Sequence, residues 1–163
     1  MSKTLEELEG DDWGEAEDGS PLVQTCHALR RKPLDQFSTE DLRVMIGQDI
    51  GLYHLLPRAI DVLRENPLAS GDLYEGDLLV SVLQCRDAQD SRADNAAELR
   101  TICTRVLETM DGQAAEFLFG GNAPKDFGLT DSSAAELVRE KITILSSEPP
   151  FRDCILFLKT HGH

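Results

Sequence analysis

Apolar residues spaced three and four apart, interrupted by glycine and proline, constrain the fold of this chain more than any other feature. The pattern is clearest from Asp41 to Leu83, where Gly47, Gly51 and Pro57 break the apolar runs. Such spacing gives each helix one apolar face, and the breaks separate short helices. A chain of 163 residues has the usual size of one domain. We therefore predict an all-α fold over residues 1–163, a compact single-domain helical bundle of roughly seven to nine helices.

Capping residues indicate where helices begin. Ser20 followed by Pro21 is typical of an N-cap and a first helical residue. Ser38 and Asp41 have the spacing of a capping box, which predicts a second helix. Because proline lacks the backbone donor of a helix interior, we expect a short turn before Pro57 and a helix that starts there.

The second half of the chain continues the helical pattern. We predict a long helix from Ser91 to Met110 and a short helical piece at AAEFLF, followed by a glycine-rich loop. A further helix is expected from Ser133 to Leu145, opened by Ser133 and Glu136, and a last one near PPFRDCILFLKT. The β-branched residues 142–145 favour a strand by composition, but their continuity with the preceding pattern favours helix.

The N-terminal segment is strongly acidic. Residues 1–19 contain eight carboxylates and one lysine, which predicts an acidic arm in front of a helical body of residues 20–163. Trp13 lies within this arm, and a tryptophan is costly to leave in water. We therefore expect Trp13 to dock on the body.

The sequence lacks the motifs of common catalytic and cofactor sites. It contains no GxSxG, no P-loop and no GxGxxG after a strand. The four cysteines are far apart and lack histidines at ligand spacing, so we expect no metal, no cofactor and reduced, buried thiols at Cys103 and Cys154. Cys26 and His27 are neighbours on a predicted helix and point about 100° apart, which argues against a catalytic dyad. We expect no enzymatic activity.

The charge balance favours a cationic partner. The chain carries 30 acidic and 16 basic residues, for a net charge of −14, which repels nucleic-acid backbones and anionic membranes. The alternative is that this charge only keeps the protein soluble. The start of the chain does not resemble a secretion signal, and no apolar run reaches the roughly 18 residues of a membrane span, so we expect a cytoplasmic protein.

One loop combines carboxylates with an aromatic residue. Asp72 and Asp77 have a structural interpretation, because Asp72 can close a turn and Asp77 can cap the following helix. The order of the acidic residues does not match a calcium-binding EF-hand loop. Tyr74 and Glu75 have no such structural role, and their composition is typical of an interface that faces a basic partner.

Four stretches, LEELEGDDWGE, TCHALRRKPL, STEDLRVMIGQDIGL and NPLASGDLYEGDLL, resemble immunity proteins of bacterial contact-dependent growth inhibition systems. The resemblance covers roughly residues 5–83, and from about Asp87 onward only the helical character is similar. It implies a protein that binds the C-terminal toxin domain of a large exoprotein and covers its active site or substrate surface.

The acidity of the chain is compatible with a toxin that cleaves RNA, because such toxins bear cationic clefts. Supported by this charge, the resemblance implies that the partner is a basic ribonuclease toxin domain, bound 1:1. The expected toxin-binding residues are Asp72, Tyr74, Glu75, Asp77, Asp111, Glu116 and Asp126. An acidic helical adaptor unrelated to toxins is the alternative. A DNA mimic is less favoured, because the charge is concentrated at the N-terminus.

Overall fold

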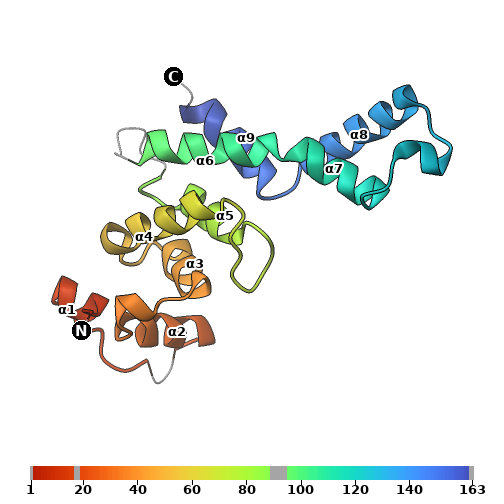
Figure 1. Ribbon diagram of the computed structural model, residues 1–163. Coiled ribbons are helices and arrows are strands. Elements are labelled where there is room, and N and C mark those ends of the chain that lie inside the picture. Colours follow the sequence, from red (N-terminus) through yellow and green to blue (C-terminus); the bar gives the residue numbers. More distant parts are fainter. Residues whose placement is uncertain (1, 17–18, 89–94, 162–163) are drawn as a thin grey trace. The chain divides into compact units, whose positions relative to one another are not determined.

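The computed structural model describes residues 2–16, 19–88 and 95–161, and every regular element within these ranges is helical (Figure 1). The all-α prediction is therefore confirmed. The α-helices are α1 (Leu5–Glu9), α2 (Pro21–Arg30), α3 (Thr39–Gly47), α4 (Leu52–Glu65), α5 (Asp77–Gln84), α6 (Ala96–Glu108), α7 (Met110–Phe119), α8 (Asp131–Leu145) and α9 (Phe151–His161). Two short 3₁₀ helices are η1 (Leu34–Gln36) and η2 (Pro124–Phe127). None of the helices in the described ranges is both long and apolar enough to cross a membrane.

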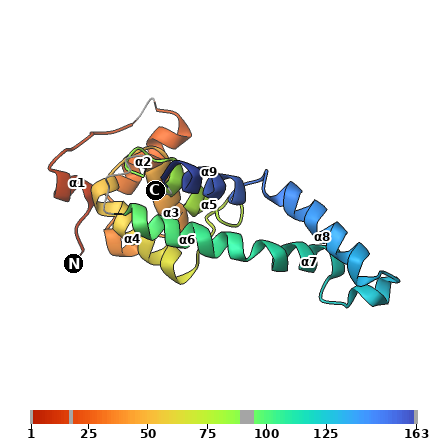
Figure 2. The same cartoon turned by 90° about the horizontal axis from the view of Figure 1, so that it is seen from above.

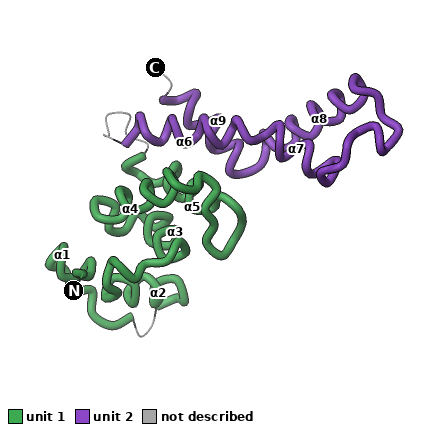
Figure 3. The backbone as a smooth tube through the Cα atoms, viewed as in Figure 1, with its two compact units in different colours: residues 1–93 green, residues 94–163 purple. Residues whose placement is uncertain are grey.

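The chain divides into two compact units, residues 1–93 and residues 94–163 (Figure 3). In unit 1, α3 packs against α2, α4 and α5, and α4 also packs against α5. The core of unit 1 is aliphatic, as the scarcity of aromatic residues leads one to expect. Its fully buried side chains include Leu5, Met45, Ile46, Leu55, Leu63, Leu78 and Leu79.

The caps predicted for α2 and α3 are confirmed. The Ser20 hydroxyl accepts a hydrogen bond from the Val23 N–H at the start of α2. At the start of α3, Ser38 and Asp41 form the expected capping box. The carboxylate of Asp41 also pairs with Lys32. These local interactions fix the two helix starts that the sequence indicates.

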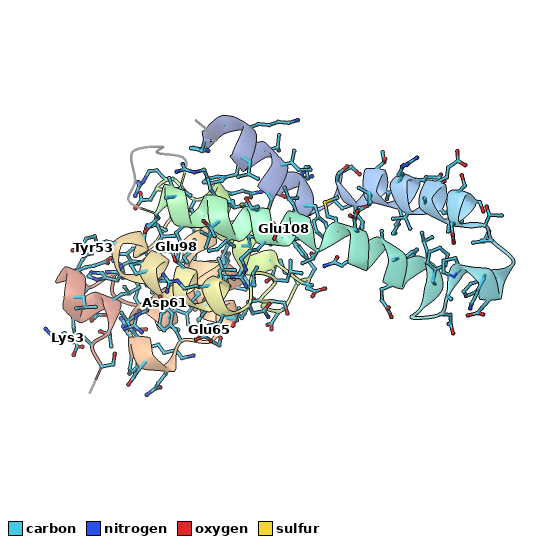
Figure 4. All side chains as sticks on the ribbon, turned by 45° about the horizontal axis from the view of Figure 1, so that its top comes forward. Lys3, Tyr53, Asp61, Glu65, Glu98 and Glu108 are labelled. Carbon is cyan, nitrogen blue, oxygen red and sulfur yellow. The ribbon has the colours of Figure 1, made fainter. Side chains whose placement is uncertain are left out.

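The break predicted at Pro57 is wrong, because α4 runs without interruption from Leu52 to Glu65. Pro57 lies in the second turn, where it removes one hydrogen bond to the carbonyl of Tyr53. Tyr53 is 85% exposed, so water can reach this region of the helix (Figure 4). The apolar face of α4, which includes Leu55, Leu56 and Leu63, is fully packed and keeps the helix intact.

The described part of the acidic N-terminal arm is ordered on α2. The guanidinium of Arg30 lies 4.1 Å from the centre of the Trp13 ring and donates hydrogen bonds to Glu9 and to the Asp11 carbonyl. Arg31 pairs with Glu6 and with other carboxylates of the arm. Trp13 therefore docks on α2 as expected, but it is only partly buried, with 40% of its surface exposed. Arg30 of α2 and its C-cap Arg31 offset part of the arm's charge.

In unit 2, α6 packs against α9 and α7 packs against α8. Cys103 of α6 and Cys154 of α9 are fully buried free thiols, as predicted. The segment 142–145 lies inside α8, which confirms helix over strand. The predicted start of α8 is wrong by two residues, because Thr130 is the N-cap and Ser133 its capping-box partner. The predicted start of α6 at Ser91 lies outside the described residues.

Candidate functional site

Residues 66–77, which are the connection between α4 and α5 together with the first residue of α5, contain four of the predicted binding residues. We call this segment the acidic loop. Asp72, Tyr74 and Glu75 are exposed on it, whereas Asp77 is only 1% exposed. The loop therefore has an outer face that a partner can reach and an inner carboxylate that holds its shape.

Asp77 organises the acidic loop from inside. The predicted capping role is wrong, because Gly76 is the N-cap of α5 and Asp77 is its first helical residue. The carboxylate turns back over the loop and accepts hydrogen bonds from the N–H groups of Gly71 at 2.6 Å and Leu73 at 3.0 Å. A buried carboxylate that accepts backbone donors in this way fixes the loop in one conformation.

A pair of charged residues on α3 holds the acidic loop from a second side. Arg43 donates two hydrogen bonds of 2.6 Å to the Glu40 carboxylate, one from Nε and one from Nη2. That carboxylate also accepts the Asp72 N–H at 2.9 Å, and Arg43 Nε lies 3.7 Å from Asp77 Oδ2. The hydrogen bonding between Arg43 and Glu40 is the main reason why the pKa of Glu40 is lowered and the pKa of Arg43 is raised. Both groups are therefore charged at neutral pH.

The close approach of the acidic loop to α3 requires glycine at position 71. A Cβ atom there would collide with the Glu40 carboxylate and would lie 3.2 Å from the Glu40 Cα. Gly76 has a φ of 85°, which a side chain would strain. Its N–H donates to the carbonyl of Leu68, so the two ends of the loop are tied together.

The outer face of the acidic loop combines apolar and acidic groups. Leu73 is 63% exposed and Tyr74 is 42% exposed, and exposed carboxylates of Asp72 and Glu75 flank them. Residues 66–77 contain no histidine, lysine, arginine or cysteine, so the ionisable side chains of the loop are three aspartate or glutamate carboxylates besides Tyr74. A rigid loop with apolar and charged groups is suited to protein recognition, because little conformational entropy is lost on binding.

Sequence reasoning missed three residues of this site. Leu73 is an exposed apolar contact, and its place between the charged positions of the loop was the available signal. Glu40, which is 32 residues before Asp72, and its partner Arg43 hold the loop from α3. Their spacing of three predicts a pair on one helix face, but nothing in the sequence indicates that this pair reaches the loop.

The other predicted binding residues lie in unit 2. Asp111 and Glu116 are exposed on α7, and Asp126 is exposed in η2. Asp126 accepts a hydrogen bond from the Ala123 N–H, which caps η2. These three carboxylates therefore lie on one helical hairpin of unit 2, formed by α7, η2 and α8. The acidic loop belongs to unit 1.

Metal ligands and reactive thiols are the remaining groups of chemical interest. No group of three or more histidine, cysteine, aspartate or glutamate side chains in the described ranges is arranged to hold a metal ion. All four cysteines are free and buried. Burial raises the pKa of the Cys26 and Cys85 thiols, so both are protonated at neutral pH and are poor nucleophiles.

Comparison with known proteins identifies a family. The model of a family of CDI (contact-dependent growth inhibition) immunity proteins matches residues 7–99, which is more than half of the chain. Comparison with curated proteins and with solved structures gives no match. The matched segment contains α3 and the whole acidic loop.

Proposed function

Because the chain belongs to the family of CDI immunity proteins, we propose that it neutralises its cognate toxin domain by covering the active site or the substrate surface. The family match is the observation that carries this proposal. It makes the chain an immunity protein for a CDI toxin. In this proposal the chain acts without catalysis, in the cytoplasm and in a 1:1 complex with the toxin domain.

We propose that the toxin is a ribonuclease with a basic substrate surface. The net charge of −14 supports this choice, because a cleft that binds RNA phosphates also attracts carboxylates. An assay of RNA cleavage by the purified toxin domain tests it directly. One equivalent of this chain should stop the cleavage, whereas a toxin domain without nuclease activity would contradict the choice of substrate.

The acidic loop is the proposed contact in unit 1. Asp72 and Glu75 raise the rate of association through their charge, and Tyr74 and Leu73 slow dissociation by burying apolar surface. Asp77 supports these contacts from inside the loop, because its carboxylate is not accessible. Asp111, Glu116 and Asp126 are the proposed contacts in unit 2.

Charge reversal in the acidic loop tests this arrangement. The double variant Asp72→Lys/Glu75→Lys should associate with the toxin domain about tenfold or more slowly at low salt, with a weaker salt dependence. Biolayer interferometry measures both quantities.

A matched control makes the same change of charge elsewhere in unit 1. Asp35 in η1 and Asp61 on α4 are both exposed, and Figure 4 labels Asp61. Their elements contact each other through a hydrogen bond from Arg58 to the Leu34 carbonyl. The variant Asp35→Lys/Asp61→Lys should keep most of the association rate. Equal slowing by both double variants would show that only the net charge matters and that the acidic loop is not the contact.

A further inference from the structure

The hairpin of α7, η2 and α8, residues 110–145, has few buried side chains. In α7 and α8 the buried residues are Met110, Ala114, Phe119 and Ala134. Two views at right angles show α7 and α8 side by side, leading away from α6 and α9 of the same unit (Figures 1 and 2). A pair of helices needs a further layer to bury its apolar side chains. The hairpin therefore offers a surface that another protein can cover.

Large apolar side chains are exposed on this hairpin. Phe117 is 71% exposed, Phe127 is 55% exposed and Ile144 is 49% exposed. The ammonium group of Lys141 lies 3.5 Å from the centre of the Phe117 ring and holds it against α8. Exposed apolar surface of this kind marks interaction sites, and a ring that is already held loses little freedom on binding.

A shallow groove lies on the same hairpin. Its volume is about 360 Å³, which is near the lower end of the roughly 300–1,000 Å³ that is usual for ligand pockets. Small side chains and ring edges from α7, the following loop and α8 form its walls, among them Gly112, Ala115, Phe119, Pro124, Ala134 and Val138. Phe117 and the groove together give the hairpin both a projecting and a receiving apolar feature.

The charge of the hairpin favours a basic occupant. Acidic residues outnumber basic ones six to three over residues 110–145. All six carboxylates are exposed, and none of them forms an ion pair in the described structure. In unit 1, by contrast, Glu9, Glu40 and Asp41 each pair with a basic side chain. The carboxylates of the hairpin are thus available to pair with a partner.

The hairpin also lies outside the segment that the family model describes. The match ends at residue 99, eleven positions before α7 begins. An immunity protein that is specific for one toxin needs contacts beyond those that its family shares. Residues 110–145 are therefore well placed to supply them.

We infer that the α7–α8 hairpin is a second toxin-binding surface that determines which toxin domain the chain neutralises, with Phe117 as its apolar anchor. This inference rests on the proposed function and names the partner for a surface outside the family segment. Its occupant is a basic face of the cognate toxin domain that has an apolar recess for the ring. Asp111 and Glu116 of α7 and Asp126 of η2 are exposed on the same hairpin and select for basic residues.

The variant Phe117→Ala tests the anchor. Its affinity for the cognate toxin domain, measured by isothermal titration calorimetry on the full chain, should fall about tenfold or more. The control is Leu156→Ala, since Leu156 is 54% exposed on α9 of the same unit but outside the hairpin. The control should retain its affinity, and both variants should keep the thermal unfolding midpoint of the wild type.

Two further measurements separate binding from selectivity. Hydrogen exchange should show protection of residues 110–129 when the cognate toxin domain binds. Phe117→Ala should also lower the ratio of cognate to non-cognate affinity, with a toxin domain from another contact-dependent inhibition system as the non-cognate probe. An equal loss towards both toxin domains would overturn the role in selectivity.

The outcomes distinguish this inference from the proposed function. If the wild type does not bind the cognate toxin domain, the proposed function fails and the inference fails with it. If the wild type binds and Phe117→Ala binds equally well, only the inference is wrong. A fall in affinity together with a lower unfolding midpoint would show that the ring packs within the chain, which also overturns the inference.

Discussion

Replacing Asp77 with asparagine should destabilise unit 1 and loosen the acidic loop. The carboxylate is buried, accepts N–H groups from Gly71 and Leu73, and lies 3.7 Å from Arg43 Nε. An amide of the same shape can keep one of these hydrogen bonds, but it turns an NH₂ group towards the other donors. Leaving a buried donor unpaired costs about 1–3 kcal/mol. Arg43 keeps its two hydrogen bonds to Glu40, so the loss of its contact with Asp77 leaves no uncompensated charge. We expect a loss of about 1–3 kcal/mol in the free energy of unfolding.

Urea unfolding followed by the fluorescence of Trp13, the sole tryptophan, measures this loss in unit 1. Glu75→Gln is the matched control, because it makes the same chemical change at an exposed position of the same loop. The control should stay within about 0.5 kcal/mol of the wild type. If Asp77→Asn is as stable as Glu75→Gln, the carboxylate does not hold the loop and the reasoning is refuted.

Three further predictions follow from the interactions in unit 1 and from the buried thiols. The pKa of the Glu40 carboxyl is lower in the folded protein than in the unfolded chain. Its ionised form therefore stabilises the fold at pH values above the ordinary glutamate pKa of about 4. This contribution is lost as the pH falls through the folded pKa. Acid titration of Glu40→Gln should therefore show a smaller loss of stability below about pH 5 than titration of the wild type. Arg30→Gln should release the arm from α2, which a red shift of Trp13 emission would reveal, and unchanged emission would contradict the contact. The four cysteines should react slowly with iodoacetamide at neutral pH and rapidly after denaturation, and rapid reaction in the native state would contradict their burial.

The helices could be predicted from sequence wherever local interactions determine their ends. The Ser38–Asp41 box lies within four residues, so the sequence contains all that it needs. The error at Pro57 has a tertiary cause, because the packed apolar face of α4 outweighs the loss of one hydrogen bond. At α8 two capping patterns overlap, and Thr130 accepts the Ser133 N–H where Ser133 itself was expected to cap.

The binding loop could be predicted only in part. Its exposed residues Tyr74 and Glu75 could be predicted from composition, because an aromatic residue beside a carboxylate is typical of an interface. The buried position of Asp77 could not be predicted, because it depends on Glu40 and Arg43 of α3 folding against the loop. Long-range contacts of this kind leave no periodic signal in the sequence.

Co-expression of this chain with the toxin domain encoded beside it tests the central claim most directly. Cells that produce the toxin domain alone should stop growing, and cells that also produce this chain should grow and should yield the two proteins as one complex. Rescue together with co-purification would agree with an immunity protein that acts by binding. Continued growth arrest in the presence of soluble, folded chain, with no complex recovered, would contradict the account.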